Sequence, residues 1–155
     1  MTKQDFKELV SNKIVYLDGA MGSNLIKRGM PQGACPEKWI LENKDVVVQL
    51  QKEYVEAGTN ILYAPTFTAN RPKLQEYGLE NDLVRINKEL VVISKEAADG
   101  KALVAGDITM TGIQLKPMGT LDIEELIEIY KEQALALIEG GVDLFVIETM
   151  MSLQE

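Results

Sequence analysis

Three acidic residues, Asp18, Asp107 and Glu148, each stand at or just after the end of a short apolar run that is typical of a buried strand. Burying a charge without a partner is costly, so such residues are normally solvated, paired or bound to a ligand. In parallel α/β folds, ligands bind at the carboxyl ends of the strands. The pattern therefore predicts a polar pocket for a cation, such as the α-ammonium group of an amino acid.

The neighbours of these acids offer groups for the other end of an amino acid. Gly19 and Ala20 directly follow Asp18, and backbone amides in such a segment are suited to a carboxylate. Thr66 adds a hydroxyl group at the same predicted edge. A structural role stays open for each residue, because acids in these positions also cap helices or bind loop amides, and Asp-Gly and Thr are common in turns.

The composition excludes several kinds of chemistry. The chain has no His and a single Cys, Cys35, so it offers no internal disulfide, no Cys/His zinc site and no His-based triad. A net charge of −8 argues against nucleic acid and anionic lipid as partners. No apolar run approaches the roughly 20 residues of a membrane span, and no secretory signal opens the chain, so we expect a cytoplasmic protein.

Short apolar runs alternate with longer segments of helical periodicity. The helix starts carry Asp45 and Asp122, the latter in a predicted capping box with Glu125, and Gly58 and Gly140 are predicted to end these helices. The predicted strands are 14–17, 61–64, 103–105 and 144–147, the predicted helices are 2–10, 45–58, 83–97 and 122–140, and 29–36 is a predicted loop.

Two segments of the chain repeat one another. Residues 56–67, "EAGTNILYAPTF", and 139–150, "EGGVDLFVIETM", align without gaps as the end of a helix, a turn and a strand. Repeated βα units favour a (β/α)8 barrel, which needs about 250 residues. The 155 residues therefore predict an α/β fold of parallel βα repeats, the N-terminal half (four strands) of a TIM barrel. We expect it to be truncated after the fourth strand, with "MMSLQE" starting a further helix.

Four motifs carry a likeness to a known family. "LDGAMGSNL", "EYVEAGTNILYAPTFTANRPKL", "AGDITMTG" and "GVDLFVIETMMSLQE" together resemble the homocysteine S-methyltransferase family, and within it the homocysteine-binding domain of the cobalamin-dependent methionine synthases. The resemblance implies a (β/α)8 barrel in which zinc activates the homocysteine thiol for methyl transfer.

The resemblance also implies roles for individual residues. Asp18 and Gly19, with Ala20 beside them, match the family's segment that contacts the amino acid end of homocysteine. Glu148 matches the residue that binds the substrate's ammonium group, and Thr66 matches a residue that lines the pocket. The family's three zinc-binding cysteines lie in Asn-Cys and Gly-Gly-Cys-Cys motifs. Cys35 matches none of them, so no metal ligand and no catalytic residue is expected in this chain.

The resemblance thus implies a methyltransferase that is inactive as this chain alone. Homocysteine is the expected small-molecule partner. Zinc and methylcobalamin are expected cofactors of the intact parent protein only, and the remaining half of the barrel with cobalamin and folate modules would be the macromolecular partners.

Three alternatives stay open. An unclosed half-barrel could self-associate through its edges and apolar face, as a structural or binding unit without catalysis. A different methyl donor is possible, since betaine- and S-methylmethionine-dependent relatives share the pocket motifs. A flavodoxin-like domain fits less well, because no Gly-rich phosphate loop is present and a further strand would be needed.

Overall fold

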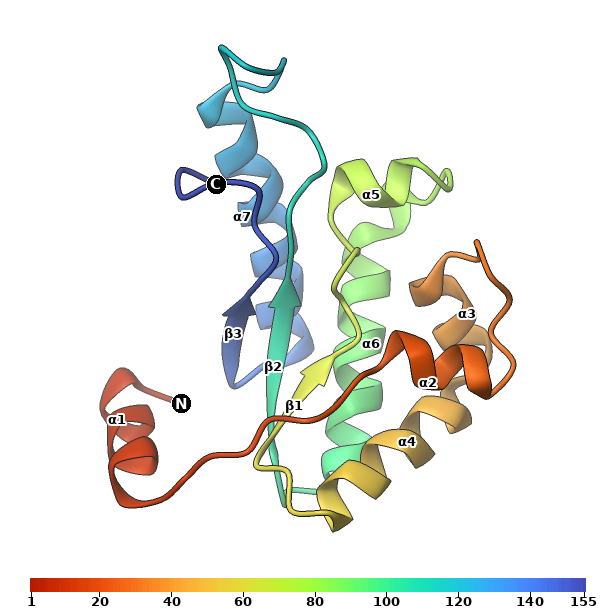
Figure 1. Cartoon of the computed structure of the whole chain (residues 1–155), viewed down its shortest axis with the longest axis vertical. Coiled ribbons are helices and arrows are strands. Elements are labelled where there is room, and N and C mark those ends of the chain that lie inside the picture. The colour runs from red at the N-terminus through yellow and green to blue at the C-terminus, as the bar shows by residue number, and fades with distance from the viewer.

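A parallel sheet of three strands forms the centre of the molecule, as the computed structural model of residues 1–155 shows. The strands are β1 (Ile61–Ala64), β2 (Leu103–Ile108) and β3 (Leu144–Ile147), in the spatial order β1-β2-β3. Ile61 pairs with Leu103, and Ala105 pairs with Leu144. All three carboxyl ends therefore lie at the same edge of the sheet (Figure 1).

Three long helices pack with this sheet (Figure 1): α4 (Lys44–Glu56), α6 (Leu83–Ala98) and α7 (Ile123–Gly140). Parallel neighbours need a crossover, which α6 provides between β1 and β2, and α7 between β2 and β3. Leu90 and Val91 of α6 are fully buried between the sheet and the other helices. The end of α7 comes close to α6, since a Cβ added at Gly140 would lie 2.9 Å from Cβ of Val91.

The remaining elements are short or peripheral. Helix α1 has a complete capping box between Thr2 and Asp5 but buries no residue, and Figure 1 shows it apart from the helix layer. These elements are α1 (Lys3–Asn12), α2 (Gly22–Lys27), α3 (Pro36–Glu42), α5 (Arg71–Gln75) and the 3-10 helix η1 (Glu80–Asp82). Only α1 among them was predicted from the sequence, because the others have at most seven residues and are too short to show a repeated apolar pattern.

The predicted strand at 14–17 is wrong, so the sheet has three strands rather than four. Only Leu17 forms an isolated parallel bridge, to Ile61, while the backbone oxygen of Tyr16 accepts from the amides of Asn60 and Ile61. The side chains of Ile14, Tyr16 and Leu17 are 73%, 59% and 50% exposed. Without a second layer to bury these side chains, pairing with β1 stays limited to a single bridge.

Two further predictions from the sequence are wrong: the capping of α7 by Asp122 and a helix at residues 150–155. Asp122 precedes α7 but does not cap it; its carboxylate instead pairs with Nζ of Lys116 at 2.6 Å. The last residue of α7 is Gly140, as predicted, and Gly141 with a φ of 93° forms the C-cap. Residues 150–155 form no helix, and the backbone there is irregular. The helices predicted at 45–58, 83–97 and 122–140 are otherwise confirmed.

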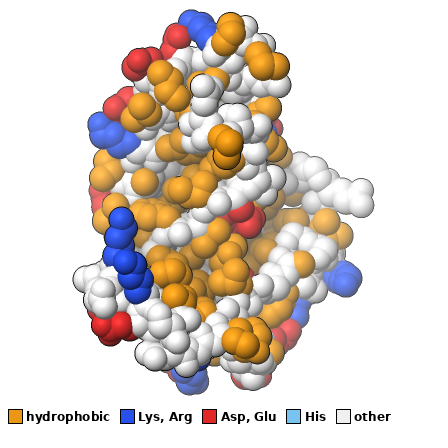
Figure 2. Space-filling view, turned by 60° about the vertical axis from the view of Figure 1, so that its left-hand side comes forward, with side chains coloured by type: hydrophobic (Ala, Val, Ile, Leu, Met, Phe, Trp, Pro, Cys, Tyr) orange, Lys and Arg blue, Asp and Glu red, His pale blue; other side chains and the backbone are white.

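One face of the molecule exposes many apolar side chains. Phe145 and Ile147 of β3 are 39% and 66% exposed. Figure 2 shows hydrophobic side chains gathered across the middle of this view, with a small acidic group among them. The half-barrel predicted from the repeat stays a prediction. None of the helices combines the length and the apolar character needed to cross a membrane.

Candidate functional site

A cavity of about 620 Å³ opens at the carboxyl ends of the strands. Its walls come from the segment 17–22, the first residues of α3, the ends of β1 and β2, and the residue after β3. Leu25, Ile40 and Phe67 give it an apolar wall. The polar side chains that line it are Asp18, Glu37, Tyr63, Thr68, Asp107 and Glu148, and no Lys or Arg is among the lining residues.

Asp18, Asp107 and Glu148 meet in this cavity, as the sequence pattern suggested they would. Oδ2 of Asp18 accepts a hydrogen bond from the amide of Tyr63 at 3.0 Å. Asp107 is only 5% exposed, and its Oδ1 has no hydrogen-bond partner. Glu148 is exposed at the end of β3. The cavity therefore gathers negative charge without a cationic side chain to balance it.

The electrostatics of the cavity follow from burial and from this crowding. Burial raises the pKa of Asp107 to about 7, with the charges of Glu148 and Asp18 acting in the same direction. Burial also raises the pKa of Asp18 to about 6, against the opposing effect of the Tyr63 amide. The pKa of Tyr63 is raised by its burial and by all three acids. A bound cation would relieve each of these unfavourable interactions.

The segment after Asp18 is held in place by Tyr54 of α4. A Cβ at residue 19 would lie 2.7 Å from the Tyr54 ring, so the close approach requires Gly19. The Tyr54 hydroxyl donates to the backbone oxygen of Ala20 at 2.9 Å, and Nδ2 of Asn24 donates to the same oxygen at 2.7 Å. The amides of Gly19, Ala20 and Met21 donate to no acceptor within the protein. This segment thus presents free N–H groups beside the cavity, suited to an anion.

The side chain of Thr66 lies behind the cavity wall and does not line it. Thr66 is fully buried; its hydroxyl donates to the backbone oxygen of Asp107 at 2.9 Å and accepts from the Asp107 amide at 3.1 Å. Two helices hold the same loop: Nε2 of Gln133 in α7 donates to the Thr66 oxygen at 3.0 Å, and Nδ2 of Asn87 in α6 donates to the Ala69 oxygen at 2.9 Å. Thr66 therefore fixes the position of Asp107.

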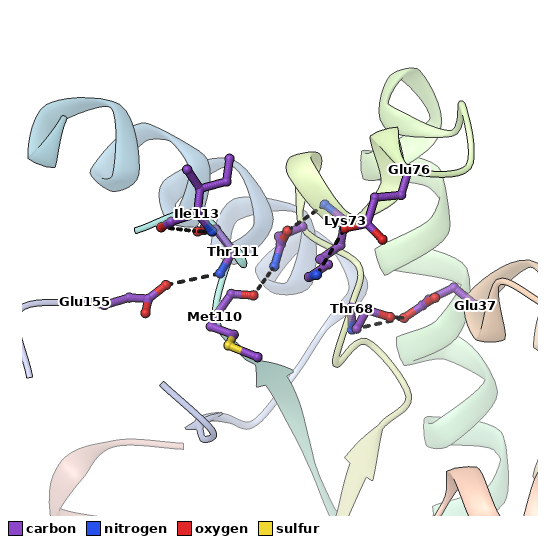
Figure 3. Close-up of polar contacts among 9 residues, drawn as sticks. Glu37, Thr68, Lys73, Glu76, Met110, Thr111, Ile113 and Glu155 are labelled. Atoms are coloured by element: carbon purple, nitrogen blue, oxygen red, sulfur yellow. Dashed lines mark hydrogen bonds and ion pairs between the residues drawn. The ribbon is translucent and has the colours of Figure 1, made fainter. Parts of the chain in front are cut away.

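Glu37 is a cavity residue that the sequence analysis missed. Its buried carboxylate accepts from the amide of Thr68 at 3.0 Å and from the Thr68 hydroxyl at 2.5 Å (Figure 3). The thiol of Cys35 donates to the other oxygen at 3.4 Å. Glu37 resembles an ordinary first-turn acid of a helix in the sequence, and no local signal marks its contact with a loop 31 residues away.

Asn70 connects the loops that follow β1 and β2. Its Nδ2 donates to the backbone oxygen of Met110 at 3.3 Å, while its Oδ1 accepts from the amide of Lys73 at 3.1 Å and so caps α5. Lys73 also forms an ion pair with Glu76, with Nζ and Oε1 3.1 Å apart, and Figure 3 shows both residues. Asn70 therefore holds the loop after β1, which contributes Phe67 and Thr68 to the cavity, against the segment after β2.

The residues of this chain do not fit the zinc centre that the resemblance implies for the family. No group of three His, Cys, Asp or Glu side chains is arranged to hold a metal ion. Cys35 is buried against Glu37, and burial together with that carboxylate raises its pKa to about 11. The thiol is consequently neither a ready metal ligand nor a nucleophile at neutral pH.

The fold and the cavity together are those of an α/β domain with a cavity at the carboxyl ends of its parallel strands. Residues 15–155 match the family model described as "Homocysteine S-methyltransferase", and the chain therefore belongs to this family of methyltransferases.

Curated relatives agree with this assignment, and a solved structure shares the fold. Over 96% of its length the chain is 26% identical to "Methionine synthase" of Mycobacterium leprae (strain TN) and 29% identical to "Betaine--homocysteine S-methyltransferase 1" of Danio rerio. The oxidized form of the homocysteine methyltransferase MmuM from Escherichia coli superposes with a TM-score of 0.82 at 20% identity over 96% of the chain, which shows the shared fold. The chain spans 13%, 38% and 57% of these three proteins.

Proposed function

We propose that the cavity binds the amino acid end of homocysteine and that the chain supplies the substrate-recognition part of a homocysteine S-methyltransferase. One observation carries the proposal: a cluster of unbalanced carboxylates and a row of free backbone amides line the same cavity. An α-amino acid has one ammonium and one carboxylate group, and it would satisfy both.

Each end of the substrate has a place in this arrangement. Glu148 accepts hydrogen bonds from the ammonium group, and the negative charge of Asp18 favours the same position. The amides of Gly19 and Ala20 bind the carboxylate. A bound zinc would supply the activation of the thiol to a thiolate, but the side chains of this chain do not provide its ligands. What they provide is orientation, because a substrate held at both ends of its amino acid moiety has few positions left for its thiol.

For the methyl donor, we propose the cobalamin-linked type of the methionine synthases. The motifs "ETMMSLQE" and "LKPMGTLDIEEL" support this assignment by their resemblance to that type. Methylcobalamin would then be the donor in the whole protein. The similarity to betaine-dependent relatives keeps betaine as the second candidate.

The exposed apolar side chains of β3 also fit this proposal. Parallel sheets are normally covered on both faces, and Phe145 and Ile147 are left uncovered. We assign them to contacts with further βα units of a barrel, of the kind that the greater length of the relatives would hold. A second copy of the chain is the alternative cover.

Replacing Glu148 by Gln is expected to weaken the binding of L-homocysteine by about tenfold or more, because a charge-assisted hydrogen bond becomes a neutral one. Binding to this chain is expected to be weak, so the titration is followed by NMR chemical shifts under reducing conditions. Glu124→Gln, at an exposed position in the first turn of α7, is the matched control. Equal affinity of Glu148→Gln and the wild type would remove Glu148 from the site.

Tyr54→Phe tests the positioning of the carboxylate-binding segment. The change keeps the ring that packs on Gly19 but removes the hydrogen bond to the Ala20 oxygen, so we expect homocysteine affinity to fall by about three- to tenfold. The same NMR titration measures it. Tyr77→Phe is the control, since that side chain is 45% exposed and its hydroxyl has no partner in the protein. A Tyr54→Phe variant with undiminished affinity would show that the segment needs no such support.

A further inference from the structure

Asp107 is the cavity acid to which the proposed function gives no role. Its side chain is 95% buried, since only 5% is exposed, and Oδ1 has no hydrogen-bond partner. The hydroxyl of Thr66 holds its backbone through both the amide and the carbonyl group. The backbone that carries this carboxyl group is therefore held at the cavity wall.

The groups that face Asp107 are acidic or weakly polar. Asp18 comes from the segment before α2, Glu148 from the end of β3, and Tyr63 from β1, while Glu37 of α3 lines the same cavity. No Lys or Arg lines it. A buried carboxyl group with acidic neighbours and no cationic partner keeps its proton to a higher pH than usual, and a cation close by favours its charged form. In agreement with this geometry, burial and the charges of Glu148 and Asp18 raise the pKa of Asp107 to about 7.

The acids differ in their free hydrogen-bonding capacity. Asp18 already accepts from the Tyr63 amide, and Glu37 accepts from Thr68 and Cys35. Oδ1 of Asp107 is buried without a hydrogen-bond partner, and the carboxylate of Glu148 lies at an exposed position. An ammonium group brings three N–H donors, so it can serve more than one carboxylate at once.

We propose that Asp107 binds the ammonium group of the amino acid in this cavity together with Glu148, and that it releases its proton when that group arrives. The O–H bond of the carboxyl group breaks, the proton passes to water, and the carboxylate accepts an N–H from the ammonium group. This inference rests on the proposed function. It adds that the site selects the amino group through two carboxylates, one of which, below neutral pH, becomes charged on binding.

The test follows the side-chain carboxyl carbons of aspartate by ¹³C NMR, with Asp107→Asn used to assign the Asp107 signal. At pH 6.5, added L-homocysteine is expected to move this signal to its ionised position. Its deaminated analogue 4-mercaptobutanoate is expected to leave the signal unchanged. Homocysteine affinity of the wild type should rise by about tenfold from pH 6 to pH 8, because one proton is released. Asp45→Asn, an exposed substitution of the same kind, should keep that rise, whereas Asp107→Asn should lose most of it.

The outcomes separate this inference from the function on which it rests. Homocysteine binding with the same pH dependence in Asp107→Asn and the wild type would overturn the role of Asp107 and leave the proposed function intact. A shift of the Asp107 signal by 4-mercaptobutanoate as large as that by homocysteine would also overturn it. If homocysteine binds neither to the wild type nor to any variant, the proposed function is wrong, and this inference is wrong with it.

Discussion

At pH 8, Asp107→Asn is expected to raise the free energy of unfolding of the chain by about 2–4 kcal/mol. The pKa of Asp107 is raised from the ordinary value of 3.8 to about 7, chiefly by burial. The folded state therefore holds its proton to higher pH than the unfolded state. The contribution of the protonated Asp107 side chain to the free energy of unfolding is fully present below pH 3.8. It is lost as the pH rises through about 7. Asparagine has the same shape without the charge, so it escapes this loss.

Urea unfolding at several pH values measures this effect. The gain in stability of Asp107→Asn over the wild type is expected to grow by about 2–3 kcal/mol between pH 5 and pH 8. Asp45→Asn, on the exposed first turn of α4, provides the control and should show no such growth. A constant difference across this range would mean that Asp107 ionises as easily in the folded as in the unfolded chain.

Thr66→Val is expected to lower the free energy of unfolding by about 2–4 kcal/mol, because it leaves two buried backbone groups of Asp107 without their side-chain partner. Valine has nearly the same volume, so the packing of this fully buried position stays the same. The measurement is chemical unfolding at a single pH. Loss of the hydrogen bonds should also broaden the NMR signals of the loop after β1.

Two companion variants identify the hydroxyl as the cause. Thr66→Ser keeps the hydroxyl group and should retain most of the stability, with only a methyl group lost. Thr120→Val makes the same replacement at an exposed position and should change the free energy of unfolding little. If Thr66→Val proves as stable as Thr66→Ser, the bonds to Asp107 contribute little to the fold.

The sequence predicts those parts of the fold that have a long periodic signal. Helices α6 and α7 repeat apolar residues over four turns or more, so their existence and type follow from the pattern alone. The run at 14–17 has the composition of a strand, but composition does not reveal whether a second layer covers it. Asp122 and Glu125 have the spacing of a capping box, yet Lys116 competes for the Asp122 carboxylate and prevents the cap.

The candidate site is predictable to a similar degree. Asp18, Asp107 and Glu148 follow apolar runs, and parallel strands bring such positions together in the cavity. The sequence does not predict the direction of a side chain after a strand. The hydroxyl of Thr66 points to the backbone of Asp107, and no pattern in the neighbouring residues indicates this contact. The contact of Glu37 with Thr68 depends on the docking of α3 against a distant loop, and only the tertiary structure reveals it.

The bonds from Gln133 and Asn87 to the loop after β1 have a consequence for variation at a distance. Both side chains reach from the helix layer to the backbone that carries Phe67 and Thr68 into the cavity. A larger residue at position 140, where α7 comes close to Val91 of α6, would shift the two helices against each other. Because Gln133 and Asn87 are bonded to the loop, this shift would also move the residues that face the ligand. Substrate preference in such a protein can thus drift through replacements on the outer helices while every residue that touches the ligand stays the same.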